Sequence, residues 1–255
     1  MTSLIDLLAS AQRTATGFTT EIPANWLQGR TAYGGLSSAL ALAAAKQVEP
    51  DLPPLRSAQV AFVGPLAGPV TVTATKLRRG RNAAFIQADI TSEAGLGLRT
   101  NFVFMSRLES AIDHDTTARA VHAPPPADAE LYTGPKEFFT GNFNFFDLKA
   151  EAGPTEWLRW GRLTDRDTLD PEIELMAMGD ALPPAAFKLF AKMTPLSSLT
   201  WQVNIVQPPA TRDGWWLLEA ETDSARNGYS SQTMRMWDAD GKLVAEGTQG
   251  VAIFG

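Results

Sequence analysis

Residues 59–65 read QVAFVGP, and residues 202–208 read QVNIVQP. The two segments share Gln, Val, Val and Pro at the same spacing, and they lie 143 residues apart. Further short matches follow in the same order at offsets of 145 to 148 residues: Gly34-Gly35 with Gly179-Asp180, Arg81-Asn82 with Arg226-Asn227, Ala94-Gly95 with Asp240-Gly241, and Thr100-Asn101 with Thr248-Gln249. A single two-residue match carries no weight, but the shared order and offset predict a duplicated unit.

Each unit combines one helix with an antiparallel sheet. In the first half, small and apolar residues recur at helical spacing from Leu36 to Ala43. Between residues 57 and 104, four runs of alternating apolar residues follow, separated by Gly-containing turns. Such short connections favour antiparallel pairing. The second half repeats this order with an apolar strand over 138–146, another near 157–163, a helical stretch from Glu172 and four more strands. The predicted fold class is α+β.

A segment between the two units breaks the periodicity. Residues 110–135 contain Pro124-Pro125-Pro126, mixed charges and no regular apolar pattern, which is typical of a linker. We therefore expect an N-terminal unit over 1–109, a linker over 110–135 and a C-terminal unit over 136–255.

The composition excludes several classes of function. The 255 residues include no cysteine, so disulfides, thiolate metal sites and a cysteine nucleophile are excluded. A net charge of −6 argues against nucleic acid as a partner. The sequence has no secretory signal, and no apolar run approaches the roughly 20 residues of a membrane helix, so we expect a cytoplasmic protein without a membrane span. Metal-ligand clusters and Gly-rich phosphate loops are absent from the sequence, and we expect no cofactor.

Four short motifs resemble one known family: Tyr33-Gly34-Gly35, Asp180, Val203 to Pro208, and Thr248-Gln249-Gly250. Their order and spacing are similar to those of the type II acyl-CoA thioesterases, of which the bacterial TesB enzyme is the best-known member. The resemblance implies a double hotdog fold, in which each of two tandem units wraps a sheet around a long helix. It also implies hydrolysis of an acyl-CoA substrate to a free acid and coenzyme A, and it leaves open whether the chain forms a homo-oligomer.

The same resemblance implies the site residues. In the family, an Asp on the second helix, a Ser or Thr at the start of the next strand and a Gln on the last strand orient the attacking water. Asp180 and Gln249 match the first and last of these, and the hydroxyl is either Ser198 or Thr200. The family pattern continues with Asp-His-Ser, whereas this chain has Thr200-Trp201-Gln202. By the repeat, Gly35 and Asn101 stand in the first unit where Asp180 and Gln249 stand in the second. One site per chain follows, with Gly35 leaving space for substrate.

These groups suit thioester hydrolysis because a thioester carbonyl needs only a positioned, partly deprotonated water and donors for the developing oxyanion. We expect the cations of Arg78, Arg79 and Arg81 to bind the phosphates of coenzyme A. His114 and His122 both lie in the predicted linker, which argues against a histidine-dependent dehydratase. An alternative from another class is an acyl-CoA-binding protein that hydrolyses little, because the stretch from Thr200 to Gln202 departs from the family pattern.

Overall fold

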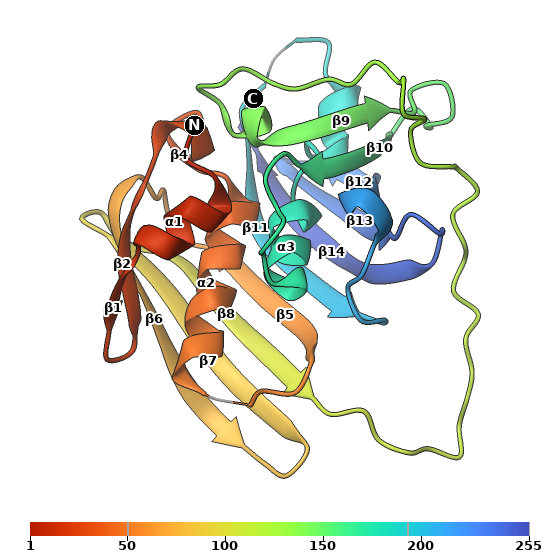
Figure 1. The fold of residues 1–255 in the computed structure, drawn as a ribbon. Coiled ribbons are helices and arrows are strands. Elements are labelled where there is room, and N and C mark those ends of the chain that lie inside the picture. Colours follow the sequence, from red (N-terminus) through yellow and green to blue (C-terminus); the bar gives the residue numbers. More distant parts are fainter. Residues whose placement is uncertain (50, 193, 255) are drawn as a thin grey trace.

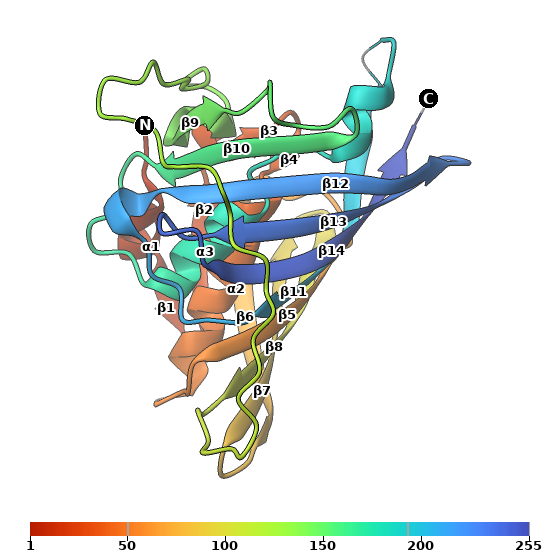
Figure 2. The same ribbon diagram turned by 90° about the vertical axis from the view of Figure 1, so that its right-hand side faces the viewer.

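Twelve strands form one antiparallel sheet that runs through both halves of the chain (Figures 1 and 2). The structure, a computed structural model, describes residues 1–49, 51–192 and 194–254. The strands of the first half are β1 (Gln12–Thr14), β2 (Gly17–Ile22), β5 (Leu55–Phe62), β6 (Gly68–Arg79), β7 (Ala83–Ser92) and β8 (Gly95–Met105). Those of the second half are β9 (Phe143–Asp147), β10 (Glu156–Leu163), β11 (Leu196–Ile205), β12 (Trp216–Arg226), β13 (Tyr229–Trp237) and β14 (Leu243–Ile253). Two short strands, β3 (Leu27–Gln28) and β4 (Thr31–Ala32), pair separately.

The sheet has a local twofold axis at its centre. Its strand order is β1-β2-β6-β7-β8-β5-β11-β14-β13-β12-β10-β9, so equivalent strands of the two halves stand at equal distances from the middle. The two halves meet where β5 pairs antiparallel with β11, and Gln59 lies directly opposite Gln202. These are the two residues that the sequence repeat equates at 143 residues. The predicted duplication and the double hotdog arrangement are confirmed.

The helices lie on one side of the curved sheet (Figure 1). The central helix α2 (Gly34–Val48) is almost entirely buried, because its Ala, Ser and Gly residues let the sheet approach closely. The short helix α1 (Leu4–Ser10) begins at a Ser3 capping box and buries Leu4 and Leu7. Among the described residues, no helix has both the length and the apolar character required to cross a bilayer.

The helix of the second half is shorter than the long helix that the resemblance implies. α3 (Pro171–Gly179) has nine residues, begins at the side-chain cap of Asp170, and ends just before Pro183-Pro184. Two consecutive prolines cannot continue a helix, and the chain resumes as the single 3-10 turn η3 (Ala185–Leu189). The apolar run over 138–146 also begins as a 3-10 turn, η2 (Phe139–Asn142), before β9. Two further 3-10 turns are η1 (Ala24–Trp26) and η4 (Arg212–Gly214).

The two halves also contact each other through η1 and η2. Asn25 Nδ2 donates to Asn142 Oδ1 at 3.0 Å, and Asn142 Nδ2 donates to the Asn25 carbonyl at 2.7 Å. Next to this buried pair, the ring of Tyr33 stacks on Phe139 with centroids 4.3 Å apart. The start of α2 is therefore held against the second half of the chain.

The segment between β8 and η2 crosses the outer face of the second half of the sheet (Figure 2). Apart from a single bridge at Tyr132, it has no strand or helix among the residues described. Trp237 Nε1 donates to the Ala118 carbonyl at 2.9 Å, and the Ala120 amide donates to the Gly241 carbonyl at 3.0 Å. These contacts cover a cluster of apolar side chains on β10, β12 and β13. The unit boundaries at residues 109 and 136 stay a prediction.

Candidate active site

Asp180 lies where the end of α3 meets the start of α2. It is the C-cap residue of α3, and it is only partly exposed. Tyr33, which precedes α2, donates its phenol proton to the Ala177 carbonyl of α3 at 2.6 Å. This contact joins the two helix ends and places the Asp180 carboxylate at the N-terminus of α2. The unpaired N–H groups of a helix N-terminus carry partial positive charge and favour an anion there.

Two glycines allow this close approach. A Cβ atom on Gly34 would lie 2.5 Å from Asp180 Oδ2, and one on Gly35 would collide with the Tyr33 hydroxyl and the Ala177 carbonyl. Gly34 therefore lets the carboxylate and the ring of Phe62, whose Cε1 would lie 2.8 Å from such a Cβ, approach the start of α2 closely. The space beside Gly35 is already filled by protein, so the structure does not support the prediction that Gly35 makes room for substrate.

A chain of hydrogen bonds fixes one oxygen of Asp180. Gln249 on β14 donates from Nε2 to Asp180 Oδ1 at 2.8 Å. Gln232 on β13 donates from Nε2 to Gln249 Oε1 at 2.9 Å. The backbone N–H of Ala185 donates to Gln232 Oε1 at 2.8 Å. The structure thus brings together Asp180 and Gln249, and it adds Gln232, which the sequence reading missed.

The environment makes this carboxylate a weak acid. Burial raises the pKa of Asp180 to about 7, although hydrogen bonds from the Gln249 side chain and the Gly35 backbone act in the opposite direction. Burial also raises the pKa of the adjacent Tyr33 phenol well above its ordinary value, and the charge of Asp180 adds to that effect. Tyr33 therefore stays protonated, while Asp180 can exchange a proton near neutral pH.

The two candidate hydroxyls lie on opposite faces of β11. Thr200 is exposed and pairs with Gly250, and a Cβ on Gly250 would lie 3.1 Å from Thr200 Oγ1. Because Gln249 points inward, its neighbour Gly250 faces outward, and Thr200 shares that outward face. Thr200 is therefore on the wrong side of the strand to complete the site, which corrects that prediction.

Ser198 returns to the inner face because a register shift separates it from Thr200. It is half-buried and pairs with Val251, which is fully buried. Among the described residues, neither the Ser198 nor the Thr200 hydroxyl hydrogen-bonds Asp180 or Gln249.

Trp201 takes the inward place on β11 beside Gln249. It pairs directly with Gln249 across the ladder and is buried, and its ring fills the space in front of Gly179, where a Cβ would lie 2.6 Å from Cη2. The departure from the family pattern thus places an indole beside Gln249 and against Gly179, the residue before Asp180.

Among the described residues of the first half, an apolar side chain stands where Gln249 stands in the second half. Ala58 pairs with Phe102 on β8 as its counterpart Trp201 pairs with Gln249 on β14. The residue equivalent to Gln249 is therefore the buried Phe102, and not Asn101 as the repeat predicted. A one-residue slip in register moves a side chain to the opposite face of a strand.

The arginine cluster lies far from Asp180. Arg78 and Arg79 end β6, and Arg81 follows in the turn to β7. Arg79 Nε lies 3.9 Å from Glu49 Oε1, beyond the C-terminal end of α2, and Arg79 Nη2 donates to the Asp51 carbonyl at 3.3 Å. Asp180 sits at the other end of this helix, and 15 residues of α-helix span about 22 Å. The structure does not bring the predicted phosphate-binding arginines to the carboxylate.

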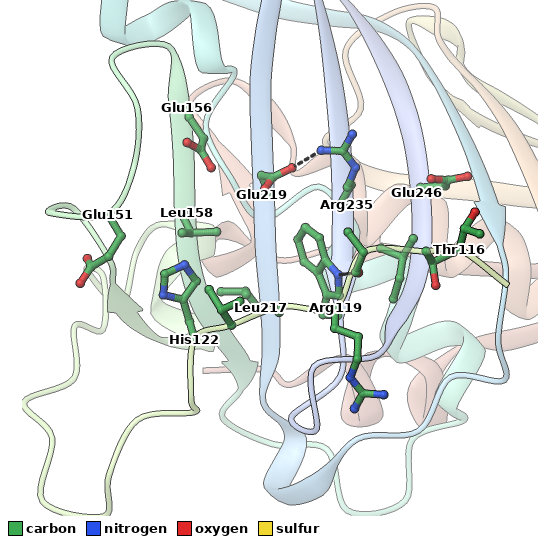
Figure 3. A pocket seen from close by; sticks show the side chains of 16 residues that line it. Thr116, Arg119, His122, Glu151, Glu156, Leu158, Leu217, Glu219, Arg235 and Glu246 are labelled. Carbon is green, nitrogen blue, oxygen red and sulfur yellow. Dashed lines mark hydrogen bonds and ion pairs between the residues drawn. The ribbon is translucent and has the colours of Figure 1, made fainter.

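A separate groove of about 620 Å³ lies on the outer face of the second half of the sheet (Figure 3). Leu158, Leu217 and Trp237 form its floor, and Arg235 on its wall is paired with Glu219 at 2.6 Å. Asp180 and Gln249 are not among its lining residues. The sheet therefore separates this groove from the candidate site.

No group of His, Cys, Asp and Glu side chains suited to hold a metal ion occurs in the part of the chain that the structure describes. The arrangement around Asp180 offers instead a carboxylate that accepts hydrogen bonds from the Gln249 side chain and the Gly35 backbone, with Oδ2 beside Gly34. This is the geometry that a general base needs.

Comparisons with known proteins agree with the double hotdog fold. A conserved hot dog fold protein of unknown function from Alicyclobacillus acidocaldarius superposes with a TM-score of 0.84 at 20% identity, covering 100% of this chain and 99% of that one. The tesB protein of Mycobacterium avium subs paratuberculosis superposes with a TM-score of 0.80 at 18% identity, covering 99% of this chain and 100% of that one. The acyl-CoA thioesterase II TesB2 of Mycobacterium marinum superposes with a TM-score of 0.76 at 16% identity, covering 98% of this chain and 96% of that one. No curated protein matches the sequence.

Sequence profiles of one family match both halves. The acyl-CoA thioesterase N-terminal domain matches residues 22–105, and the acyl-CoA thioesterase C-terminal domain matches residues 113–253. Because the two matches together span most of the chain, this protein belongs to the TesB-like acyl-CoA thioesterase family and is a thioester hydrolase.

Proposed function

We propose that this protein hydrolyses an acyl-CoA thioester to the free acid and coenzyme A with a water activated by Asp180. The observation that carries the proposal is a carboxylate with Oδ1 held by Gln249, Oδ2 beside Gly34, and a pKa of about 7. A base whose pKa lies near the working pH is the most effective one, and such a group commonly contributes about 100- to 10,000-fold to the rate.

The reaction then follows from the positions of the groups. Asp180 Oδ2 accepts a proton from the water as the water oxygen attacks the thioester carbonyl carbon. N–H groups in the first turn of α2 other than that of Gly35, which bonds Asp180, supply donors for the oxyanion that forms. When the carbon–sulfur bond breaks, Asp180 returns the proton to the leaving thiolate of coenzyme A. No covalent enzyme intermediate is required.

Ser198 is the remaining hydroxyl candidate for orienting the water. It shares the inner face of β11 with Trp201, whereas Thr200 does not. We propose Ser198 as a water-orienting residue of lesser effect than Asp180, because its hydroxyl makes no hydrogen bond to the described Asp180 or Gln249.

One observation favours a second candidate, an acyl-CoA-binding protein with little hydrolysis. The indole of Trp201 takes the inward place beside Gln249 where the family pattern leads one to expect polar side chains. An apolar indole there offers no acceptor or hydroxyl beside Gln249 to orient a water.

Release of thiol from short, long and aromatic acyl-CoAs tests the proposal. Asp180→Asn is expected to lower kcat at least about 100-fold, because it removes the proton acceptor and keeps the side-chain size. Asp113→Asn, an exposed linker residue, is the matched control and should retain full activity. If the wild type binds coenzyme A in calorimetry but turns over no acyl-CoA, the binding function is correct. Equal activity of the wild type and Asp180→Asn would refute the role of Asp180.

A further inference from the structure

Gln232 is a buried glutamine whose amide is engaged at both ends. It is fully buried on the inner face of β13, directly opposite Gln249 in the ladder with β14. Its Nε2 donates to Gln249 Oε1 at 2.9 Å, and its Oε1 accepts the Ala185 N–H at 2.8 Å. Gln232 makes no contact with Asp180 in this hydrogen-bond chain and acts on it only through Gln249.

The orientation of a glutamine amide matters here because a half-turn exchanges its oxygen and nitrogen. Gln249 supports the carboxylate only when Nε2 faces Asp180, since the flipped amide would place its oxygen against Asp180 Oδ1. A donor on the other side of Gln249 selects the useful orientation, and Gln232 Nε2 is that donor. The orientation of Gln232 is selected in turn by the Ala185 N–H, a backbone donor that cannot be exchanged for an acceptor.

The direction in which each of these hydrogen bonds is donated is therefore set by the backbone N–H of Ala185 at the start of η3. We propose that Gln232 is a positioning residue for thioester hydrolysis, which locks the Gln249 amide as a donor to Asp180 Oδ1, so that Oδ2 is the oxygen that accepts the proton of the water. This inference rests on the proposed function of Asp180. It assigns a role to a residue that lies outside the motifs shared with the family.

Loss of this lock has a defined consequence for the carboxylate. Gln249 lowers the pKa of Asp180 through its donated hydrogen bond, so a flipped or mobile Gln249 raises that pKa further. Among the described residues, the Gly35 backbone and the phenol of Tyr33, which stays neutral, also face Asp180. The acidic limb of the rate profile, which requires deprotonated Asp180, then moves to higher pH.

Gln232→Met and Gln232→Glu test the inference, because both keep the length of the side chain. Methionine removes the donor at every pH. Glutamate removes it only where the carboxyl is ionised, and the ionised form would repel Gln249 Oε1 and favour the flip. We expect kcat to fall at least about tenfold with KM changed less than about threefold, and the acidic limb to move up. Gln87→Met is the matched control, because Gln87 bonds Asp89 in the first half of the sheet, away from the site.

A double-mutant cycle separates positioning from a structural effect. In a Gln249→Leu background, Gln232→Met should cause no further loss of kcat, because the amide that it orients is already absent. Additive losses in kcat, or an unchanged limb in Gln232→Met, would overturn the inference.

A second readout does not depend on turnover. The carboxyl carbon of Asp180, assigned by its loss in Asp180→Asn, can be titrated by carbon-13 NMR in the wild type and in Gln232→Met. A higher titration midpoint in Gln232→Met supports the lock even if the wild type hydrolyses no acyl-CoA, in which case only the proposed function has failed. Equal midpoints in folded proteins would refute the lock whether or not the enzyme is active.

Discussion

Asp180→Asn should stabilise the protein at neutral and alkaline pH while it removes activity. The ordinary pKa of this carboxyl is 3.8, and in the folded protein it is about 7. A raised pKa means that the folded state resists ionisation of this carboxyl. The contribution of Asp180 to stability is therefore fully present below pH 3.8 and is lost as the pH rises through about 7. Each unit of pKa corresponds to about 1.4 kcal/mol, so ionised Asp180 costs about 4 kcal/mol above pH 7. Asparagine carries no charge and avoids this cost.

The pH-dependent part of the effect gives the sharpest test, because any constant effect of the substitution cancels. Linkage with these two pKa values predicts that the stability gained by Asp180→Asn grows by about 3 kcal/mol between pH 5 and pH 8.5. Urea unfolding of both proteins at several pH values measures this difference, provided that the m-values agree. Asp113→Asn should show no such trend. A stability difference between Asp180→Asn and wild type that is independent of pH would show that Asp180 titrates normally and cannot serve as a base near neutrality.

Further predictions concern the residues around the site and the contact between the halves. Gly34→Ala places a methyl group 2.5 Å from Asp180 Oδ2, so thiol release should fall at least about tenfold. Full activity of this variant would argue against Oδ2 as the oxygen that accepts the proton of the water. Thr200→Val should leave kcat within about twofold, because Thr200 faces outward; a loss like that of Asp180→Asn would reverse this conclusion. Asn142→Ala should lower the free energy of unfolding by about 1 to 3 kcal/mol in urea, since it leaves buried amide groups unpaired, and an unchanged midpoint would argue against that contact. The phosphate role of the arginine cluster stays a prediction. Arg81→Ala should raise KM for acyl-CoA severalfold if the cluster binds the phosphates, and an unchanged KM would refute that role for Arg81.

The sequence predicted the arrangement of the two halves because repeated patterns depend on chain order alone. Gln59 and Gln202 were equated by their spacing, and they meet at the axis of the sheet. Asp180 and Gln249 could also be predicted from the sequence, since both stand within motifs that resemble the family. Their hydrogen bond at 2.8 Å joins residues that are 69 positions apart.

The details that the sequence could not predict depend on strand register. The register shift before Thr200 reverses the face on which that hydroxyl lies, and no composition signal marks it. The predicted equivalence of Asn101 with Gln249 was wrong by one residue, because it too depends on strand register. The residue equivalent to Gln249 is the inward-facing Phe102, and Asn101 beside it faces outward. Gln232 offered one usable signal. It is a polar residue at an inward position of the alternating run from Ser230 to Met236, which suggests a buried partner but does not identify it.

The position of the site at the junction of the two helix ends has a consequence for how the chain could be divided. The carboxylate and both glutamines come from the second half, but Tyr33 and the two glycines that frame Asp180 come from the first. Neither half contains a complete site. A chain severed within the irregular segment that crosses the outer face should therefore recover hydrolysis only when both fragments reassociate. Complementation of inactive fragments would make turnover a direct reporter of their assembly.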